Sequence, residues 1–193
     1  MRAEGPGQAV LLMLEVAGRL AAAQVDYAVI GAMAAAVHGA VRASLDVDAI
    51  VGMPAREAAT LRDLLASPDW SLELRLGDDA DPIPALLAVT DGHGNRVDLL
   101  IGLRGLDPAA LSRARPVEFR GQTLRVVGLE DFIAMKAFAG AAQDLSDARQ
   151  AIAAGRDSLD ADLLRQLARR FGGATAQRVE ELLAGSGPGN APH

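Results

Sequence analysis

Two aspartates interrupt a segment that otherwise has the composition of a buried strand. Asp46 and Asp48 lie within residues 45–51, whose other members are Leu, Val, Ala and Ile. Strand side chains alternate between two faces, so both carboxylates point to the same side, about 7 Å apart. Two like charges in a buried sheet are unfavourable unless a cation lies between them. The segment therefore predicts a strand that binds a hard divalent metal ion. A solvated strand end is the alternative.

A third aspartate has the same setting. Asp98 interrupts the apolar segment 96–101, and three carboxylates converge if this strand lies beside residues 45–51. Oxygen ligands without His or Cys suit Mg²⁺ or Mn²⁺ better than zinc. Three aspartates can hold two such ions about 4 Å apart, which is the arrangement used for phosphoryl and nucleotidyl transfer. For Asp98 alone, a capped strand end is the alternative.

Upstream of the two aspartates, a short apolar strand at 27–30 leads through Gly31 into an alanine-rich helix at 31–38. Glycine permits close approach of the backbone, and a helix N-terminus attracts phosphate. Arg42 and Ser44 precede the aspartates and are further candidates to face the site.

Periodicity and turn residues predict the other elements. Helices are expected at 8–23, 56–66, 129–139, 145–153, 160–171 and 174–184, and strands at 70–76, 85–90, 96–101, 117–119 and 123–127. Asp144 is expected to cap the helix at 145–153, with Asp147 at its third position. The pattern predicts an α+β fold, a mixed sheet flanked by helices with a helical C-terminal part. The expected organisation is a core at 1–128, a helical part packed on it at 129–184, and a disordered tail at 185–193.

The amino-acid composition excludes several classes of protein. The chain has 193 residues, half of them hydrophobic, and no cysteine, which excludes disulfides and thiolate chemistry. A net charge of −6 argues against a general DNA-binding protein, although residues 96–125 hold six arginines against three acids. That stretch is either solvated surface or a patch for a polyanion. Neither a membrane span nor a signal peptide is expected, so we predict a cytoplasmic protein.

Lys136 is the single lysine of the chain. Its compact ammonium group differs from the planar fork of arginine as a phosphate ligand, which favours a functional role. On an uninterrupted helix Asp147 would project about 20° from Lys136, so an ion pair on a solvated face is the alternative. We expect His38 to form local contacts instead of acting as a base.

Together these features resemble the polymerase-β-like nucleotidyltransferase superfamily. The pattern of that superfamily is a hydrophobic residue, Gly, and Gly or Ser, followed at a distance by two carboxylates one residue apart. In this chain residues 30–32 match the first part, residues 46–48 match the second, and thirteen residues separate them. Asp98 matches the third carboxylate. Residues 129–136 and 144–147 resemble the branch of AbiEii-like nucleotidyltransferases from type IV toxin–antitoxin systems.

The resemblance implies roles for the matched residues. Asp46 and Asp48 would bind the metal and a nucleoside triphosphate such as ATP. Asp98 would bind the catalytic metal and help to activate the acceptor hydroxyl, and Lys136 would contact the triphosphate. Asp144 and Asp147 are further candidates for nucleotide binding. Ala32 departs from the pattern because alanine lacks the hydroxyl with which serine can bind phosphate.

The leading hypothesis is therefore a Mg²⁺- or Mn²⁺-dependent enzyme that transfers a nucleoside monophosphate from an NTP to an acceptor hydroxyl and releases pyrophosphate. The acceptor implied by the resemblance is RNA, such as tRNA, with a cognate antitoxin as partner. A protein side chain or a small molecule is a further candidate. The main rival is an inactive binding module or antitoxin-like partner with this fold, and a phosphohydrolase is a third interpretation.

Overall fold

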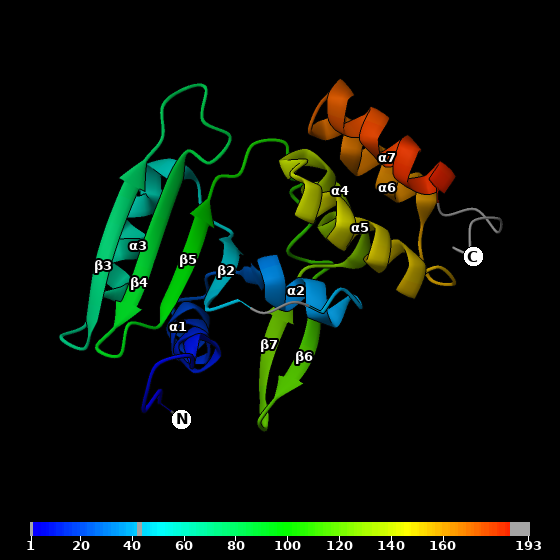
Figure 1. The fold of residues 1–193 in the computed structure, drawn as a ribbon. Coiled ribbons are helices and arrows are strands. Elements are labelled where there is room, and N and C mark those ends of the chain that lie inside the picture. The colour runs from blue at the N-terminus through cyan, green and yellow to red at the C-terminus, as the bar shows by residue number, and fades with distance from the viewer. Residues whose placement is uncertain (1, 42–43, 186–193) are drawn as a thin grey trace. The chain divides into compact units, whose positions relative to one another are not determined.

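The computed structural model describes residues 2–41 and 44–185 (Figure 1). This part of the chain forms two compact units. The first unit comprises residues 2–33, 44–104 and 114–126, and the second comprises 34–41, 105–113 and 127–185. The division into two parts at residue 128 stays a prediction. The expected disordered tail lies outside the described residues from residue 186 onward.

All the described strands belong to the first unit. They are β1 (Tyr27–Val29), β2 (Asp46–Val51), β3 (Trp70–Leu76), β4 (Ala85–Asp91), β5 (Arg96–Ile101), β6 (Arg115–Phe119) and β7 (Gln122–Val126). They form one sheet in the order β3-β4-β5-β2-β1-β7-β6. β2 runs parallel to β5, and β1 runs parallel to β7, whereas the other neighbours are antiparallel. The predicted mixed sheet is therefore confirmed.

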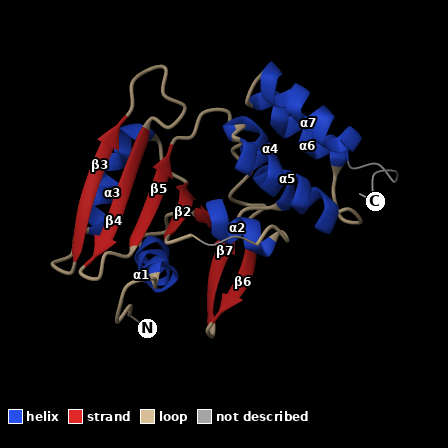
Figure 2. Cartoon of the chain, viewed as in Figure 1, coloured by secondary structure: helices blue, strands red, loops and turns tan. Residues whose placement is uncertain are grey.

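The helices are distributed over both units (Figure 2). The first unit holds α1 (Ala9–Ala22), the short 3₁₀ helix η1 (Ala55–Glu57) and α3 (Ala58–Leu65). The helix α2 (Gly31–Val37) begins in the first unit and continues into the second. The second unit also contains α4 (Leu129–Ala139), α5 (Ala142–Ala154), α6 (Ala161–Arg170) and α7 (Gly173–Gly185). No described helix is long and apolar enough to cross a membrane.

One face of the sheet in the first unit forms a hydrophobic core with α1 and α3. The helix α1 contacts β2 and β5, and α3 contacts β3 and β4. Along β5, Val97, Leu99 and Ile101 are fully buried, and they alternate with partly exposed residues. Burial of these side chains drives the sheet and helices together. The alternate positions of β2 and β5, which include the aspartates, consequently face the other side of the sheet.

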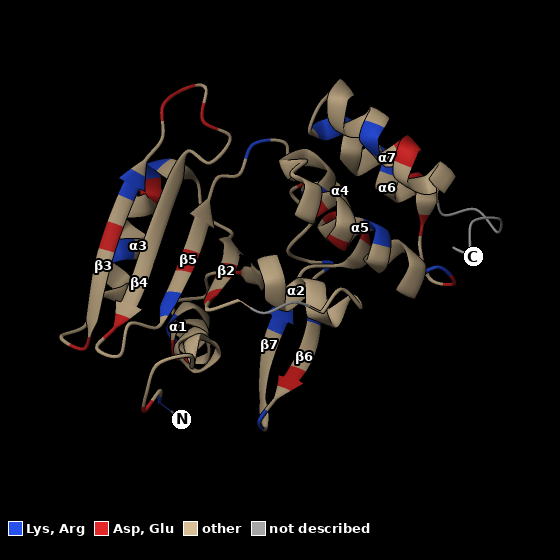
Figure 3. Ribbon diagram, viewed as in Figure 1, with Lys and Arg blue, Asp and Glu red and all other residues tan. Residues whose placement is uncertain are grey.

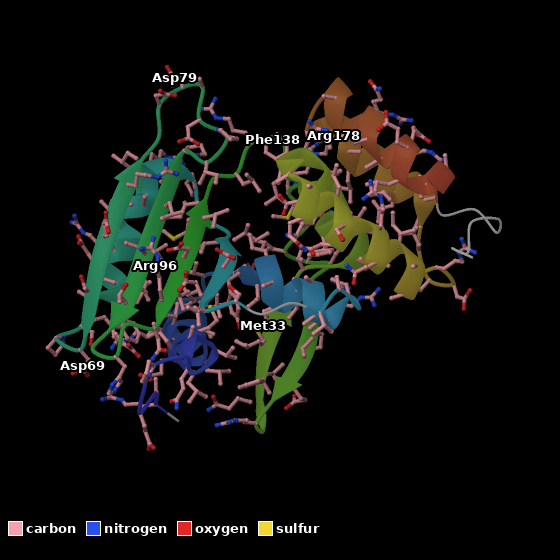
Figure 4. All side chains as sticks on the ribbon, in the orientation of Figure 1. Met33, Asp69, Asp79, Arg96, Phe138 and Arg178 are labelled. Atoms are coloured by element: carbon pink, nitrogen blue, oxygen red, sulfur yellow. The ribbon has the colours of Figure 1, made fainter. Side chains whose placement is uncertain are left out.

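The second unit is built around α4, which contacts α5, α6 and α7. The helix buries Phe132 and Ile133 almost completely. It ends at Gly140, which has a left-handed conformation with φ of 70° and whose N–H donates to the carbonyl of Lys136. Arg178 of α7 donates to the last carbonyls of α4, at Ala137 and Phe138 (Figure 4). These bonds satisfy acceptors that a helix C-terminus leaves without intrahelical partners.

The prediction that Asp144 caps a helix at 145–153 was wrong. The helix α5 begins at Ala142, with Ala141 as its N-cap and no side-chain cap. Because Gly140 already ends α4, the extended Ala141 is enough to start the next helix. Asp144 consequently lies inside the first turn, where its carboxylate accepts a hydrogen bond from Lys136 Nζ at 2.8 Å.

Candidate functional site

Two of the predicted carboxylates lie next to each other on the sheet of the first unit. In the parallel pair β2–β5, Asp48 is the register partner of Asp98, and Asp46 is the partner of Arg96. Neighbouring strands are about 4.8 Å apart, and successive residues on one face of a strand are about 7 Å apart. The four residues therefore stand at the corners of a small quadrilateral on one face. The pairing of these two strands, on which the convergence of the carboxylates depends, is therefore present.

The surroundings of the quadrilateral explain why polar residues are tolerated there. Asp46 is exposed, and Asp48 and Asp98 are partly buried. The residues between them, Val47 and Val97, point into the hydrophobic core on the opposite face. A half-buried carboxylate keeps contact with water or polar partners, so it avoids the cost of full desolvation. Figure 3 shows acidic positions on both β2 and β5.

Gly31 lies directly against Asp48. Its φ is +62°, and a Cβ atom at this position would overlap with the carboxylate of Asp48. The N–H of the preceding residue, Ile30, donates to the Asp48 carbonyl at 2.8 Å. The close backbone approach that was predicted for Gly31 is therefore made to a carboxylate of the site, and glycine is required for both conformation and space.

If the expected nucleotidyl transfer takes place at this site, substituting Gly31 with Ala should slow it strongly, whereas Gly94→Ala should not. Gly94 is the matched control because it has a φ of +78° and no atom within 4 Å of an added Cβ. Each alanine adopts a left-handed conformation, which costs roughly 1–2 kcal/mol in both proteins. Gly31→Ala should lose more stability in urea unfolding, because its Cβ also overlaps with Asp48. Only Gly31→Ala also displaces Asp48, and a displaced reacting group costs on the order of 10²-fold in rate. Equal activities of the two variants would contradict the assigned contact.

Arg96 is a site residue that the sequence interpretation missed. Its Nε donates to Oδ1 of Asp98 at 2.8 Å, and the side chain is 39% exposed (Figure 4). The hydrogen bond to Asp98 raises the pKa of Arg96, and the negative charges of Asp46 and Glu73 act in the same direction. The sequence did hold a signal for Arg96: it lies two residues before Asp98, so both side chains are on one face of a strand.

The carboxylates match a divalent metal in chemistry and register. Their oxygens are the ligands that Mg²⁺ and Mn²⁺ prefer, and Asp48 and Asp98 are neighbours. As the side chains lie, however, no group of three or more Asp, Glu or His residues within 2–41 and 44–185 is arranged to hold a metal ion. Asp98 instead binds Arg96. The donor chemistry therefore fits a metal ion, and the side chains must rearrange to gather around it.

The remaining predicted residues near the quadrilateral make local contacts. Ala32 is 5% exposed and offers no polar side-chain atom. Ser44 Oγ donates to the carbonyl of Asp46 at 3.0 Å, so it fixes the start of β2. Arg42 lies outside the described residues. A separate cavity of about 350 Å³ in the first unit includes Trp70 and His93 in its lining but none of the three aspartates.

The other three predicted residues lie together in the second unit. Lys136 Nζ is 2.8 Å from Asp144 Oδ1 and 2.9 Å from Asp147 Oδ2, although Gly140 interrupts the helix between them. The ion pair with Asp147, which was the alternative to a functional role of Lys136, is present. It is buried and not on a solvated face, because the side chains of Lys136 and Asp147 are 9% and 1% exposed. Asp147 also accepts a hydrogen bond from Gln143. Contact of these residues with a nucleotide stays a prediction.

Local pairing also accounts for other polar residues. His38 Nε2–H donates to the carbonyl of Val127 at 2.8 Å, so the predicted local role is confirmed. Arg113 binds Asp131 and Asp107, and these partners raise its pKa. Two arginines of the basic stretch, Arg96 and Arg113, are therefore engaged with carboxylates of their own units.

Solved structures define the class of fold. A nucleotidyltransferase-like antigenic protein from Paracoccidioides brasiliensis matches with a TM-score of 0.53 and 17% identity over 90% of this chain and 84% of that chain. ANT(2″)-Ia in complex with adenylyl-2″-tobramycin matches with a TM-score of 0.58 and 14% identity over 85% and 96%. The mixed sheet and its helices therefore form a nucleotidyltransferase-like fold.

The sequence assigns the chain to a family. A family profile described as nucleotidyl transferase of unknown function, DUF2204, matches residues 10–184, and the chain belongs to this family. No curated protein sequence matches the chain significantly.

Proposed function

We propose that the protein is a metal-dependent nucleotidyltransferase that transfers a nucleoside monophosphate from an NTP to an acceptor hydroxyl and releases pyrophosphate. The observation that carries the proposal is the shared register of Asp48 and Asp98, with Asp46 on the same sheet face. Membership in a nucleotidyl transferase family supports the reaction class. The finer assignment to AbiEii-like toxins rests on the sequence resemblance alone.

The three aspartates would divide the work between nucleotide and acceptor. Asp46 and Asp48 would hold the metal that accompanies the triphosphate, and Asp98 would hold the metal at the acceptor. Bound there, Mg²⁺ or Mn²⁺ would stabilise the negative charge of the in-line displacement. The acceptor oxygen would attack the α-phosphorus, the bond to pyrophosphate would break, and the hydroxyl proton would pass toward Asp98.

Two classes of acceptor follow from different observations. The sequence resemblance favours an RNA end such as that of tRNA, with an antitoxin as partner. A small hydroxyl compound is supported by the similar fold of ANT(2″)-Ia, whose structure holds adenylyl-2″-tobramycin. The pairing of Arg96 and Arg113 with carboxylates reduces the positive charge available to RNA.

A nucleotide-binding module without transferase activity is the second candidate. Two observations favour it. Ala32 lacks a side chain that can bind phosphate. Asp98 is engaged by Arg96, and the three carboxylates as they lie are not arranged to hold a metal ion. Such a module would bind an NTP and leave it intact.

Transfer of label separates the two candidates. The protein is incubated with Mg²⁺ and each α-³²P-labelled NTP, and either total tRNA or tobramycin is added as acceptor. We expect label to move to one acceptor with the wild-type protein and not with Asp98→Asn. Binding of an NTP without transfer to either acceptor would favour the inactive module. Transfer that survives in Asp98→Asn would contradict the proposed site.

A further inference from the structure

The place of Arg96 on the sheet has a consequence for metal binding. It is the one cation at a corner of the quadrilateral, with Asp46 beside it on β2 and Asp98 two residues along β5. Asp48 occupies the fourth corner. Three carboxylates so close together repel one another unless positive charge lies among them. Arg96 supplies positive charge to Asp98.

A hydrogen bond shows that Arg96 binds the carboxylate of Asp98. Its Nε contacts Oδ1 of Asp98 at 2.8 Å, which is the distance of a charge-assisted hydrogen bond. The Asp98 side chain is only 18% exposed, so water competes weakly for it. The hydrogen bond engages one of the two carboxylate oxygens of Asp98, so a metal ion bound to this carboxylate would stand close to the positive guanidinium and be repelled by it.

We propose that Arg96 is an internal counter-ion that stands in for the metal and competes with it for Asp98. The proposal rests on the metal site of the proposed function and adds a residue that sets its affinity. Metal-free protein holds Asp98 on Arg96, and metal binding moves the guanidinium away, toward water. Arg96 thereby keeps the carboxylates together in the absence of metal and raises the metal concentration that the site requires.

Arg75 provides a matched control. It lies on β3, on the same sheet face by alternation and register, so its removal changes the charge of that face equally. It pairs with Asp81, outside the quadrilateral. A change seen with Arg96→Gln but not with Arg75→Gln therefore reports local competition and not the general field of the protein.

Binding of Mn²⁺ alone to the full chain tests the competition, by calorimetry or electron paramagnetic resonance. Arg96→Gln should bind Mn²⁺ roughly tenfold more tightly than wild type, because one positive charge about 5 Å from the site is lost. Arg96→Lys, which keeps the charge, should stay near the wild type, and Arg75→Gln should change little. Equal affinities of wild type and Arg96→Gln would overturn the proposal. Weaker binding by Arg96→Gln would also overturn it, by making Arg96 a residue that orients Asp98.

Thermal unfolding in EDTA provides a readout without metal. Arg96→Gln should unfold at a lower temperature than Arg75→Gln, and adding Asp98→Asn to Arg96→Gln should restore stability by removing one repelling charge. No such difference would overturn the counter-ion role even if Mn²⁺ binds. Absence of Mn²⁺ binding in both wild type and Arg96→Gln would instead overturn the proposed metal site and, with it, the competition.

Discussion

Asp48→Asn is expected to lose nucleotidyl transfer by about three orders of magnitude while the protein stays folded. Asparagine has nearly the shape of aspartate but lacks its charge, so the contact with Gly31 is retained and the metal ligand is weakened. Loss of a charged ligand in a site that stabilises transferring phosphate is expected to raise the barrier by about 4 kcal/mol, a thousandfold in rate. The rate of NTP-dependent label transfer measures this change.

Asp63→Asn is the control for this substitution. Asp63 is a surface carboxylate of α3 in the same unit, paired with its neighbour Arg62. Its removal changes the net charge by the same amount without touching the quadrilateral. Activity should therefore match the wild type. A similar loss in both variants would indicate a general charge effect, and full activity of Asp48→Asn would exclude Asp48 from the site.

Lys136→Met is expected to cause the largest loss of stability. Lys136 neutralises Asp144 and Asp147, and the side chains of Lys136 and Asp147 are nearly buried. Methionine fills a similar volume but leaves two carboxylates without their cation. Breaking a buried pair by removing one partner costs about 3–5 kcal/mol. Urea unfolding should show this loss as a shift of the midpoint to lower concentration.

Arg165→Met is the matched control in the same unit. Arg165 also binds two carboxylates, those of Asp162 and Glu180, but on the surface. Exposed ion pairs contribute little because water and salt screen them, so the midpoint should not move. Equal midpoints for Lys136→Met and wild type would show that the buried pair contributes nothing. A reduced affinity for NTP in folded Lys136→Arg would support the predicted contact with the triphosphate.

Local sequence patterns predicted the helices and strands well, because the formation of a helix or strand depends largely on residues that are close in the sequence. The alternation along 70–76 and the helical pattern at 129–139 match β3 and α4 as observed. The prediction failed at Asp144, where a residue with strong capping preference instead binds Lys136 from another helix. That choice depends on tertiary contacts, which outweigh a local preference.

The candidate site could be predicted only in part. The alternation of apolar and acidic residues indicated that Asp46, Asp48 and Asp98 interrupt buried strands. The register that makes Asp48 and Asp98 neighbours depends on two strands about fifty residues apart, and the pattern alone does not fix it. Arg96 was missed because an arginine next to an acidic residue is ordinarily a surface pair, and only the sheet shows that it faces Asp46 as well.

If the three aspartates form a metal-dependent NTP site, calorimetry of NTP binding reveals it without knowledge of the acceptor. Wild-type protein is titrated with each NTP in the presence of Mn²⁺ and again in EDTA, and Asp48→Asn is titrated alongside. We predict binding of at least one NTP that requires Mn²⁺ and is lost in Asp48→Asn. No binding of any NTP, or binding that is the same in EDTA and in Asp48→Asn, would contradict the claim.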